Sequence, residues 1–549
     1  MTTTSPVVIG IIDDGLAFAH ERFRNGLATR VEFWWLQDGT YWKGPSNLYY
    51  GRELGKADID ALMTRCTSAG LVDEDEVYQR AGLNDFTFDS HKSAAWRLSH
   101  GTHVMDLACG YDSAEGRDDR PIVVVQLPAR VTADTSGADL RPYAAEAIDY
   151  ILNCADRIAQ ARGVTILPVV INLSYGTIGG PHDGTSPFER FIDRRVAQRQ
   201  ARGSTLDVII PSGNSHLSRC HAEIAFANAG ATADLPWRIQ PDDQTPNFLD
   251  IWLPPSNSAG ANRIKLKIRP PGGNKSQYIE EGSKALLEWR DASGNVYCQA
   301  HYAFFPAPTA RGRFRIRTRP TATVESSTSV APAGIWKIRL KNKSLSPREV
   351  VQAWIQRDES LYGHPLRGRQ SYFDDPLYER FDNAGRDVEI DRTRSLVRRA
   401  QLLNSLATGR DMVVVGGYVQ ESRAPCKYSA AGPVTTPRGL QVPPRIGPDA
   451  LIVSDDSLPH GGVLAAASRS GGVVAMNGTS VAAPQIARWL AEQRAKGITT
   501  RGVDLAQTKA KNDEQANKAL PGPPRPPPER GGAGRVNLPP VNRLPRVWR

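Results

Sequence analysis

Long hydrophobic runs are missing from this sequence of 549 residues. No stretch reaches the roughly 18 consecutive apolar residues of a membrane-spanning helix, so we expect no membrane association. The N-terminus, MTTTSPVV, also lacks the basic, apolar and small-residue regions of a secretory signal peptide. Both absences favour a protein that stays in the cytoplasm.

Cysteine is scarce, and no two cysteines form a C-x-x-C pair. The chain contains Cys66, Cys109, Cys154, Cys220, Cys298 and Cys426. In a chain of this length without a signal peptide, widely spaced cysteines are expected as free thiols and not as a disulfide framework. This again favours a reducing, cytoplasmic location.

Histidine is also rare, which limits the metal sites that the chain can build. Two of the 10 histidines, His100 and His103, lie three residues apart in the segment SHGTHV. That spacing suits metal ligation, but no third ligand with suitable spacing accompanies the pair. We therefore expect no metal site, and we expect His103 to be a buried structural residue.

Positive charge exceeds negative charge by 10, but the excess is local. The stretch from Lys496 to Arg549 holds 11 Lys and Arg against 4 Asp and Glu. Nucleic-acid binding needs a basic face with aromatic or groove-reading elements. The chain offers only this tail and one Arg-rich strand at 313–319, so we expect no nucleic-acid partner.

The sequence does contain the alternation of strands and helices that is typical of an α/β protein. An opening apolar run, VVIGII, ends at Asp13-Asp14-Gly15, which suits a strand buried on both faces of a parallel sheet. Further helices are predicted at 141–163 and 188–202, and further strands at 164–173 and 206–211. This order predicts a doubly wound, mostly parallel sheet, with functional residues at the carboxyl ends of its strands.

Between positions 234 and 359 the apolar residues instead recur at every second position. Ile264, Leu266 and Ile268, for example, alternate with Lys and Arg. This period predicts half-exposed antiparallel strands, and so an inserted β-sandwich. The predicted domains are the first part of the α/β domain at 1–233, with an inserted loop at about 40–95, the sandwich at 234–359, the second part of the α/β domain at 360–519, and a proline-rich basic tail at 520–549, which is expected to be extended. We also expect the polar stretch 360–409 to be partly helical, in its segment SLVRRAQLLNSLA at 395–407.

The segment NGTSVAAP places Ser480 at the start of a predicted helix. A serine there lies beside unpaired backbone amides and the positive end of the helix dipole, which stabilise a developing oxyanion. Taken alone, a Thr-Ser pair before a helix usually only caps the helix.

Asp13 and His100 stand in two further segments that carry chemistry. A serine hydroxyl becomes a good nucleophile only when an imidazole takes its proton and a carboxylate orients that imidazole. The segment IIDDG supplies the carboxylate, from Asp13, and the segment SHGTHV supplies the imidazole, from His100. Taken alone, Asp-Asp-Gly is an ordinary turn.

Together these three segments, in the order Asp, His, Ser, resemble the subtilisin-like serine proteases (subtilases). The resemblance covers about residues 6–216 and 410–495. It implies a subtilisin-like α/β fold in which Asp13 orients His100, His100 acts as the base and Ser480 is the nucleophile. It also implies that His20 is structural.

The resemblance extends to two loops. Ser212-Gly213-Asn214 is similar to the loop that supplies the oxyanion donor in that family, which implies this role for Asn214. Ser174, Tyr175 and Gly176, in NLSYG, are similar to its substrate-binding strand. Ser212 and Gly213 are then expected to help bind substrate.

The implied activity is that of a serine endopeptidase acting on peptide or protein substrates through an acyl-enzyme. A peptide cyclase or transpeptidase on the same site is an alternative, and a catalytically idle binding module is another. The chemistry requires no cofactor. Subtilases commonly hold structural calcium, which we assign to no residue here.

Regulation is a further expectation. Only six residues precede the strand at Val7, which leaves no room in this sequence for a folded inhibitory propeptide. We therefore expect low basal activity and control by a trigger or a regulatory protein partner. The loop at about 40–95, the sandwich and the tail are the candidate restraints.

Overall fold

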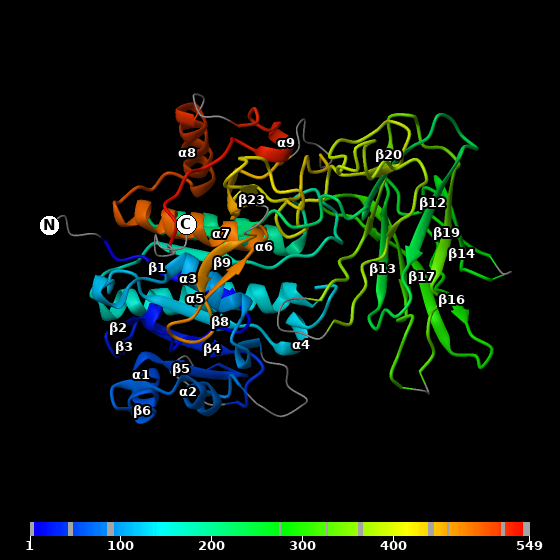
Figure 1. Ribbon diagram of the computed structural model, residues 1–549. Coiled ribbons are helices and arrows are strands. Elements are labelled where there is room, and N and C mark those ends of the chain that lie inside the picture. Colours follow the sequence, from blue (N-terminus) through cyan, green and yellow to red (C-terminus); the bar gives the residue numbers. More distant parts are fainter. Residues whose placement is uncertain are drawn as a thin grey trace.

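The computed structural model describes residues 5–41, 48–84, 93–137, 139–273, 276–325, 328–360, 366–436, 444–457, 461–517 and 522–541. They form an α/β body and a β-sandwich that lie side by side, with the sandwich drawn mostly in green (Figure 1). The chain leaves the body after β10, builds the sandwich and returns to the body at β23.

Among the described residues, eight strands form the central sheet of the body, in the order β24-β23-β10-β9-β1-β8-β4-β5. They are β1 (Val8–Asp13), β4 (Val31–Leu36), β5 (Arg52–Gly55), β8 (Ile122–Gln126), β9 (Val169–Leu173), β10 (Leu206–Pro211), β23 (Val413–Val419) and β24 (Ala450–Asp455). Neighbouring strands run parallel except at the edge, where β5 pairs antiparallel with β4.

Helices cover both faces of this sheet. α3 (His100–Cys109) and α7 (Thr479–Ala495) pack on one face, and α5 (Leu140–Ala161) and α6 (Pro187–Ala201) pack on the other. Ile9 and Ile11 of β1 join the core beneath α7, whereas Val8 and Ile12 join the core beneath α5. A strand with two buried faces needs apolar residues at successive positions, which explains its unbroken apolar run.

Shorter elements complete the body. The remaining helices are α1 (Lys56–Arg65), α2 (Glu74–Ala81), α4 (Ala129–Thr132), α8 (Gly502–Ala516) and α9 (Pro528–Gly531), with 3-10 turns at Glu21–Phe23, Ser93–Ala95 and Ser113–Glu115. Three two-stranded ribbons are β2 (Arg24–Asn25) with β3 (Ala28–Thr29), β6 (Thr67–Ser68) with β7 (Leu71–Val72), and β25 (Val463–Ala466) with β26 (Val473–Met476). In the described part of the chain, no helix is long and apolar enough to span a membrane.

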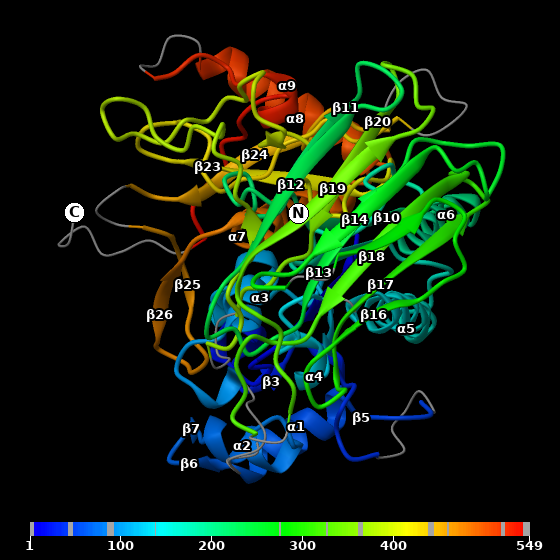
Figure 2. The ribbon, with the colours of Figure 1, turned by 90° about the vertical axis from the view of Figure 1, so that its right-hand side faces the viewer.

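The sandwich consists of two antiparallel sheets, which face the viewer in Figure 2. One sheet contains β16 (Leu287–Arg290), β17 (Val296–Phe305), β18 (Arg311–Thr318), β13 (Asn247–Trp252), β20 (Val350–Ile355), β11 (His221–Ala225) and β22 (Val397–Arg398). The other contains β15 (Gln277–Glu280), β14 (Ile264–Arg269), β19 (Gly334–Asn342), β12 (Thr232–Ile239) and β21 (Tyr372–Phe373). The predicted fold class, a doubly wound sheet with an inserted antiparallel sandwich, is confirmed.

Several local features differ from the sequence predictions. The sandwich sheet includes β11 and β22, which lie outside the predicted range 234–359. The stretch predicted as a loop at about 40–95 contains β5, α1, β6, β7 and α2, while its positions 42–47 and 85–92 lie outside the described residues. The division into domains stays a prediction.

Two further segments were predicted with the wrong local structure. Residues 395–407 are not helical, since they form the short strand β22 followed by turns, and Gln401 has a left-handed φ of 59°. The proline-rich tail is not extended throughout: α9 forms there, and Arg535 and Val536 are buried against the body, where Arg535 bridges to Leu451. Its positions 520–521 and 542–549 lie outside the described residues.

Candidate active site

The carboxyl ends of three neighbouring strands meet the N-termini of two helices at one place in the body. Asp13 is the last residue of β1, Ser174 follows β9, and Asn214 lies just beyond β10. His100 begins α3, and Ser480 lies in the first turn of α7. Since β10, β9 and β1 are adjacent in the sheet, these five residues from distant parts of the sequence converge.

Asp13 and His100 form a buried, hydrogen-bonded pair. The distance from His100 Nδ1 to Asp13 Oδ1 is 2.8 Å, and the Asp13 side chain has no exposed surface. Burial by itself lowers the pKa of His100, but the charge and hydrogen bond of Asp13 outweigh it, so that the pKa is raised overall. Because Nδ1 is held by Asp13, Nε2 is the nitrogen left to exchange a proton with a nucleophile.

Tyr175 packs beside this pair. Its ring meets the His100 ring edge to face, with 5.8 Å between the ring centroids and an interplanar angle of 71°. Burial raises the pKa of the Tyr175 hydroxyl well above its usual value, and the nearby carboxylates of Asp14 and Asp13 raise it further. Tyr175 therefore stays protonated and shields one side of the imidazole from water.

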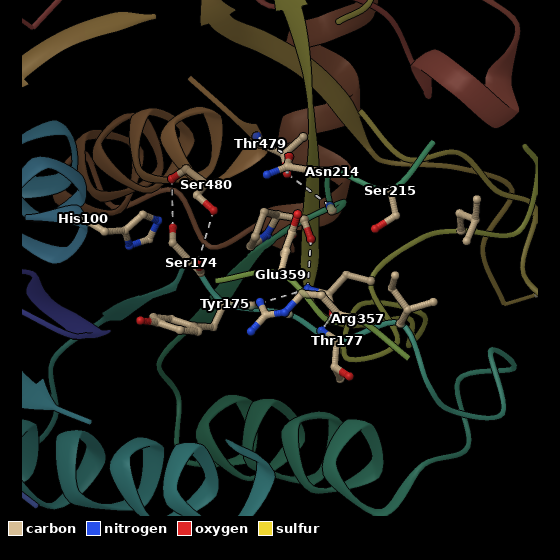
Figure 3. Close-up of a pocket in the computed structure, with 16 residues that line it drawn as sticks. His100, Ser174, Tyr175, Thr177, Asn214, Ser215, Arg357, Glu359, Thr479 and Ser480 are labelled. Atoms are coloured by element: carbon tan, nitrogen blue, oxygen red, sulfur yellow. Dashed lines mark hydrogen bonds between the residues drawn. The ribbon is translucent and has the colours of Figure 1, made fainter. Parts of the chain in front are cut away.

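Ser480 exchanges two hydrogen bonds with Ser174. Ser480 Oγ donates to the Ser174 backbone carbonyl at 3.2 Å, and Ser174 Oγ donates to the Ser480 carbonyl at 2.9 Å (Figure 3). Gly478 precedes this turn with a φ of 120°, and a Cβ there would approach Asn214 Nδ2 to 3.1 Å. The glycine therefore lets the loop before Ser480 pass close to Asn214.

Asn214 is oriented by the residue next to Ser480. Its Oδ1 accepts hydrogen bonds from the backbone amide and the hydroxyl of Thr479, both at 2.9 Å. A backbone amide can only donate, which identifies the bonded atom as oxygen and leaves Nδ2 as the outward donor. Asn214 is exposed at the pocket mouth, so Nδ2 is available to a negatively charged oxygen.

A pocket of about 70 Å3 opens beside these residues. The sequence-predicted residues that line it are His100, Ser174, Tyr175, Gly176, Gly213, Asn214 and Ser480. Ser212 lies behind the wall instead: it is fully buried, and its carbonyl accepts a hydrogen bond from the Asn404 backbone amide at 2.7 Å. Ser212 therefore supports the pocket and does not line it.

Four residues that the sequence did not point to also shape this pocket. Arg357, Glu359, Leu402 and Asn404 line it, and all four come from the segment between the last long strand of the sandwich and β23. Asn404 Nδ2 donates to the carbonyls of Tyr175 (2.9 Å) and Pro211 (3.2 Å), and so joins the two strand ends that flank the pocket. No local motif marks these residues, because only the tertiary fold brings them here.

Three side chains at this site lie close enough together to be considered as ligands of a metal ion. Among the described residues, Asp13, Asp14 and His100 offer ligand atoms within 4.8 Å of one another. This group does not fit calcium, which takes oxygen ligands, because one of its three donors is an imidazole nitrogen already paired with Asp13.

His103 Nε2 is bonded to the Val463 carbonyl at 2.8 Å, as a structural histidine would be. His20 is buried as well, and its Nδ1 accepts from the Arg22 amide at 3.1 Å.

A scan against protein-family models finds no match for this sequence, and a search of curated proteins finds none either. Solved structures do match. The CspB protease of Clostridium perfringens is similar with a TM-score of 0.65 and 19% identity, covering 97% of this chain and 93% of that chain. The PatG macrocyclase domain matches with a TM-score of 0.33 and 12% identity, covering 98% and 90%. The likeness to the CspB protease concerns the fold alone: this protein has the subtilisin-like fold, with a β-sandwich inserted into it.

Proposed function

We propose that this protein is a serine endopeptidase that hydrolyses peptide bonds through an acyl-enzyme on Ser480. The observation that carries the proposal is the Asp13–His100 hydrogen bond of 2.8 Å at the carboxyl end of β1, beside a serine in the first turn of α7. A serine that only capped the helix would need neither the imidazole nor the buried carboxylate.

In the first half of the reaction Ser480 Oγ attacks the carbonyl carbon of the scissile peptide bond. The hydroxyl turns from the Ser174 carbonyl toward His100, and Nε2 takes its proton as the new C–O bond forms. The imidazolium is stabilised by Asp13, which remains a carboxylate. Asn214 Nδ2 and the backbone amide of Ser480 donate to the oxyanion.

The tetrahedral intermediate then collapses, and the C–N bond breaks as His100 Nε2 gives its proton to the leaving amine. A water molecule next attacks the ester carbonyl, with His100 again taking the proton. The C–O bond to Ser480 then breaks as His100 Nε2 returns this proton to Ser480 Oγ, and the new carboxyl end of the substrate is released. The Ser174–Gly176 edge beyond β9 is suited to pair with the substrate backbone as an added strand.

We further propose that the enzyme works on peptides or proteins in a reducing compartment, the cytoplasm. All six cysteines are free and buried, which suits a protein that does not depend on disulfides. Control by a trigger or a protein partner remains part of the proposal.

Covalent labelling with a fluorophosphonate tests the proposed function directly. The full-length protein should be labelled on Ser480, and it should cleave casein or a generic peptide. Ser480→Ala should keep the melting temperature and abolish both readouts. Ser258→Ala, which removes an exposed hydroxyl from the sandwich, is the matched control and should be labelled like the wild type.

Two results would contradict the proposal. One is a wild-type protein that the probe does not label, which is the behaviour of an idle binding module. The other is a Ser480→Ala variant that still cleaves peptide. Product masses separate hydrolysis, which adds one water molecule, from cyclisation, which adds none.

A further inference from the structure

Arg357 reaches the pocket from the inserted sandwich and not from the catalytic body. It follows β20 by two positions, it lines the same pocket as Ser480, and it is only 8% exposed. Figure 3 shows its side chain beside Tyr175 and Thr177, on the same side of the pocket as Glu359. The sandwich thus places a cation in the wall of the pocket that Ser480 also lines.

The segment around Arg357 is fixed firmly to the body. Gln356 Oε1 accepts hydrogen bonds from the Ile178 amide at 2.9 Å and the Gly179 amide at 2.6 Å, in the loop after β9. Asp358 Oδ1 accepts from the Thr135 hydroxyl at 2.6 Å. With anchors on both sides, the backbone of Arg357 has little freedom, so its guanidinium is held in place before any ligand arrives.

The guanidinium itself has few partners. Its Nε donates to the Thr135 carbonyl at 2.9 Å, and one Nη donates to the Asp134 carbonyl at 3.5 Å. Among the described residues, no carboxylate lies within ion-pair distance of it. An arginine has five N–H donors, so several of them remain available on the pocket side.

Other buried arginines of this protein are compensated more fully. Arg311 pairs with Asp183 at 3.0 Å, and Arg494 pairs with Asp207 at 2.7 Å. Arg30 lacks such a carboxylate but donates to four backbone carbonyls, those of Arg22, Cys109, Arg117 and Arg120. A buried charge is costly unless it is paired, so the position of Arg357 at a substrate pocket points to a partner that the substrate brings.

The opposing charge of Glu359 does not cancel this preference. Glu359 lines the pocket but is exposed to solvent, and no described cation pairs with it. Water screens an exposed charge strongly, whereas a charge in a buried wall acts through a lower effective dielectric constant. The field inside the pocket is therefore dominated by Arg357.

We propose that Arg357 is a specificity-determining residue, and that the pocket takes an acidic side chain, Asp or Glu, of the residue whose carbonyl Ser480 attacks. This inference rests on the proposed function. When that carbonyl oxygen lies at Asn214 Nδ2, the side chain of the same residue enters the pocket between the Ser174–Gly176 and Pro211–Asn214 segments. Sites for drug-sized ligands measure about 300–1,000 Å3, so a pocket of about 70 Å3 suits one short side chain.

Matched peptide substrates test the inference on the full-length enzyme. They differ only at the cleaved residue, as Glu against Gln and Asp against Asn, so that shape is kept and charge is changed. A hydrogen bond between charged groups predicts that kcat/KM is about 10- to 100-fold higher for the acidic member of each pair. If the basal rate is too low to measure, peptide aldehydes with the same residues should compete with fluorophosphonate labelling in the same order.

Three pocket variants and one control test whether Arg357 causes this preference. Arg357→Met should reduce the Glu-to-Gln ratio to about 1, whereas Arg357→Lys should keep part of it. Glu359→Gln, an exposed position that does not threaten folding, should increase the ratio. Arg348→Met removes an exposed arginine from the same sandwich and should leave the ratio unchanged.

The outcomes separate this inference from the proposed function. A wild-type enzyme that is labelled on Ser480 but prefers Gln or a basic residue overturns the inference alone. The same holds if Arg357→Met melts like the wild type and keeps the ratio; if this variant does not fold, the wild-type preference between Glu and Gln decides alone. A wild-type protein that is not labelled overturns the proposed function, and the inference with it.

Discussion

The hydroxyl of Ser480 donates its hydrogen bond to the backbone carbonyl of Ser174, at 3.2 Å. In this arrangement the Ser480 hydroxyl points to Ser174 and not to His100, although His100 is already oriented by Asp13. The bond is long for an O–H donor, so rotation of the Ser480 side chain costs little. The proposed mechanism therefore requires one rotation of the Ser480 side chain, which substrate binding is expected to favour.

The first prediction concerns pH. His100 must be neutral to accept the proton of Ser480, so kcat/KM should rise with pH and level off above the pKa of His100. In the fold this pKa is raised above 6.5, because Asp13 outweighs the effect of burial. Asp13→Asn should move the midpoint to lower pH and reduce kcat by about 10⁴-fold, since the imidazole loses its orienting partner.

A pH–rate profile from 5 to 9 for the wild type, Asp13→Asn and Asp14→Asn checks this. Asp14 is a neighbouring carboxylate that raises the pKa of His100 less than Asp13 does, so Asp14→Asn should shift the midpoint by a smaller amount. A wild-type midpoint below 6.5, or an Asp13→Asn profile identical to that of the wild type, would contradict the assigned pair.

The second prediction concerns Asn214. Its Nδ2 donates to an oxygen that is negatively charged only in the transition state, so Asn214→Ala should lower kcat by about 10²- to 10³-fold and leave KM nearly unchanged. The lost acceptor for the Thr479 amide should also reduce the free energy of unfolding by about 1 kcal/mol. Steady-state kinetics and thermal melts measure the two effects, and a raised KM with normal kcat would count against the oxyanion role.

The sequence predicted elements that local composition determines. β10 was expected at 206–211 and lies at Leu206–Pro211. In an α/β protein, a short apolar run bounded by turns can form little other than a buried strand. β11 was missed because its sequence, HAEIA, has two alanines and little apolar surface to mark it as a strand. Residues 395–407 have the apolar spacing of a helix, but the left-handed Gln401 and the side-chain bonds of Asn404 fix another conformation.

The proposed catalytic residues were identified because each stands in a distinctive local sequence. The residues of the pocket wall were not identified from the sequence, for a physical reason. Arg357 bonds the Thr135 carbonyl and Asn404 bonds the Tyr175 carbonyl, and both partners are more distant in sequence than any motif extends. The roles of Arg357 and Asn404 therefore depend on how the sandwich docks on the body. A motif can indicate chemistry at one position, but it cannot indicate which residues from a distant part of the sequence lie beside it.

The third prediction concerns Asn404, a positioning residue. Its Nδ2 bonds the Tyr175 and Pro211 carbonyls, and its Oδ1 accepts from the Thr177 amide at 3.2 Å. Asn404→Ala leaves these buried groups unpaired, which should reduce the free energy of unfolding by about 2–3 kcal/mol. The two strand ends should also move, so kcat/KM should fall.

The variant Asn404→Asp separates the effect of Asn404 on the position of the two strand ends from its effect on the stability of the fold. The carboxylate keeps the acceptor for Thr177 but places a negative oxygen against two carbonyls, so this variant should be less stable than Asn404→Ala. Thermal melts and kcat/KM for both variants provide the check. Two variants that melt and cleave like the wild type would show that Asn404 does not hold the two walls together.

The last prediction concerns the sandwich as a folding unit. β11 pairs with β20 over five residue pairs, from His221 opposite Trp354 to Ala225 opposite Val350. The His221 and Trp354 rings also stack, with 5.0 Å between their centroids. A fragment of residues 234–359 lacks β11, which turns β20 into an exposed edge with an apolar surface.

A fragment of residues 221–402 restores β11 and β22. We expect it to show a β-type circular dichroism spectrum and one cooperative thermal transition, whereas the 234–359 fragment should melt at lower temperature or aggregate. Because the sandwich core continues into Ile178 and Ala430 of the body, even the longer fragment should be less stable than the sandwich within the full chain. If the shorter fragment melts as cooperatively and at the same temperature as the longer one, β11 is a docking strand and not part of the folding unit.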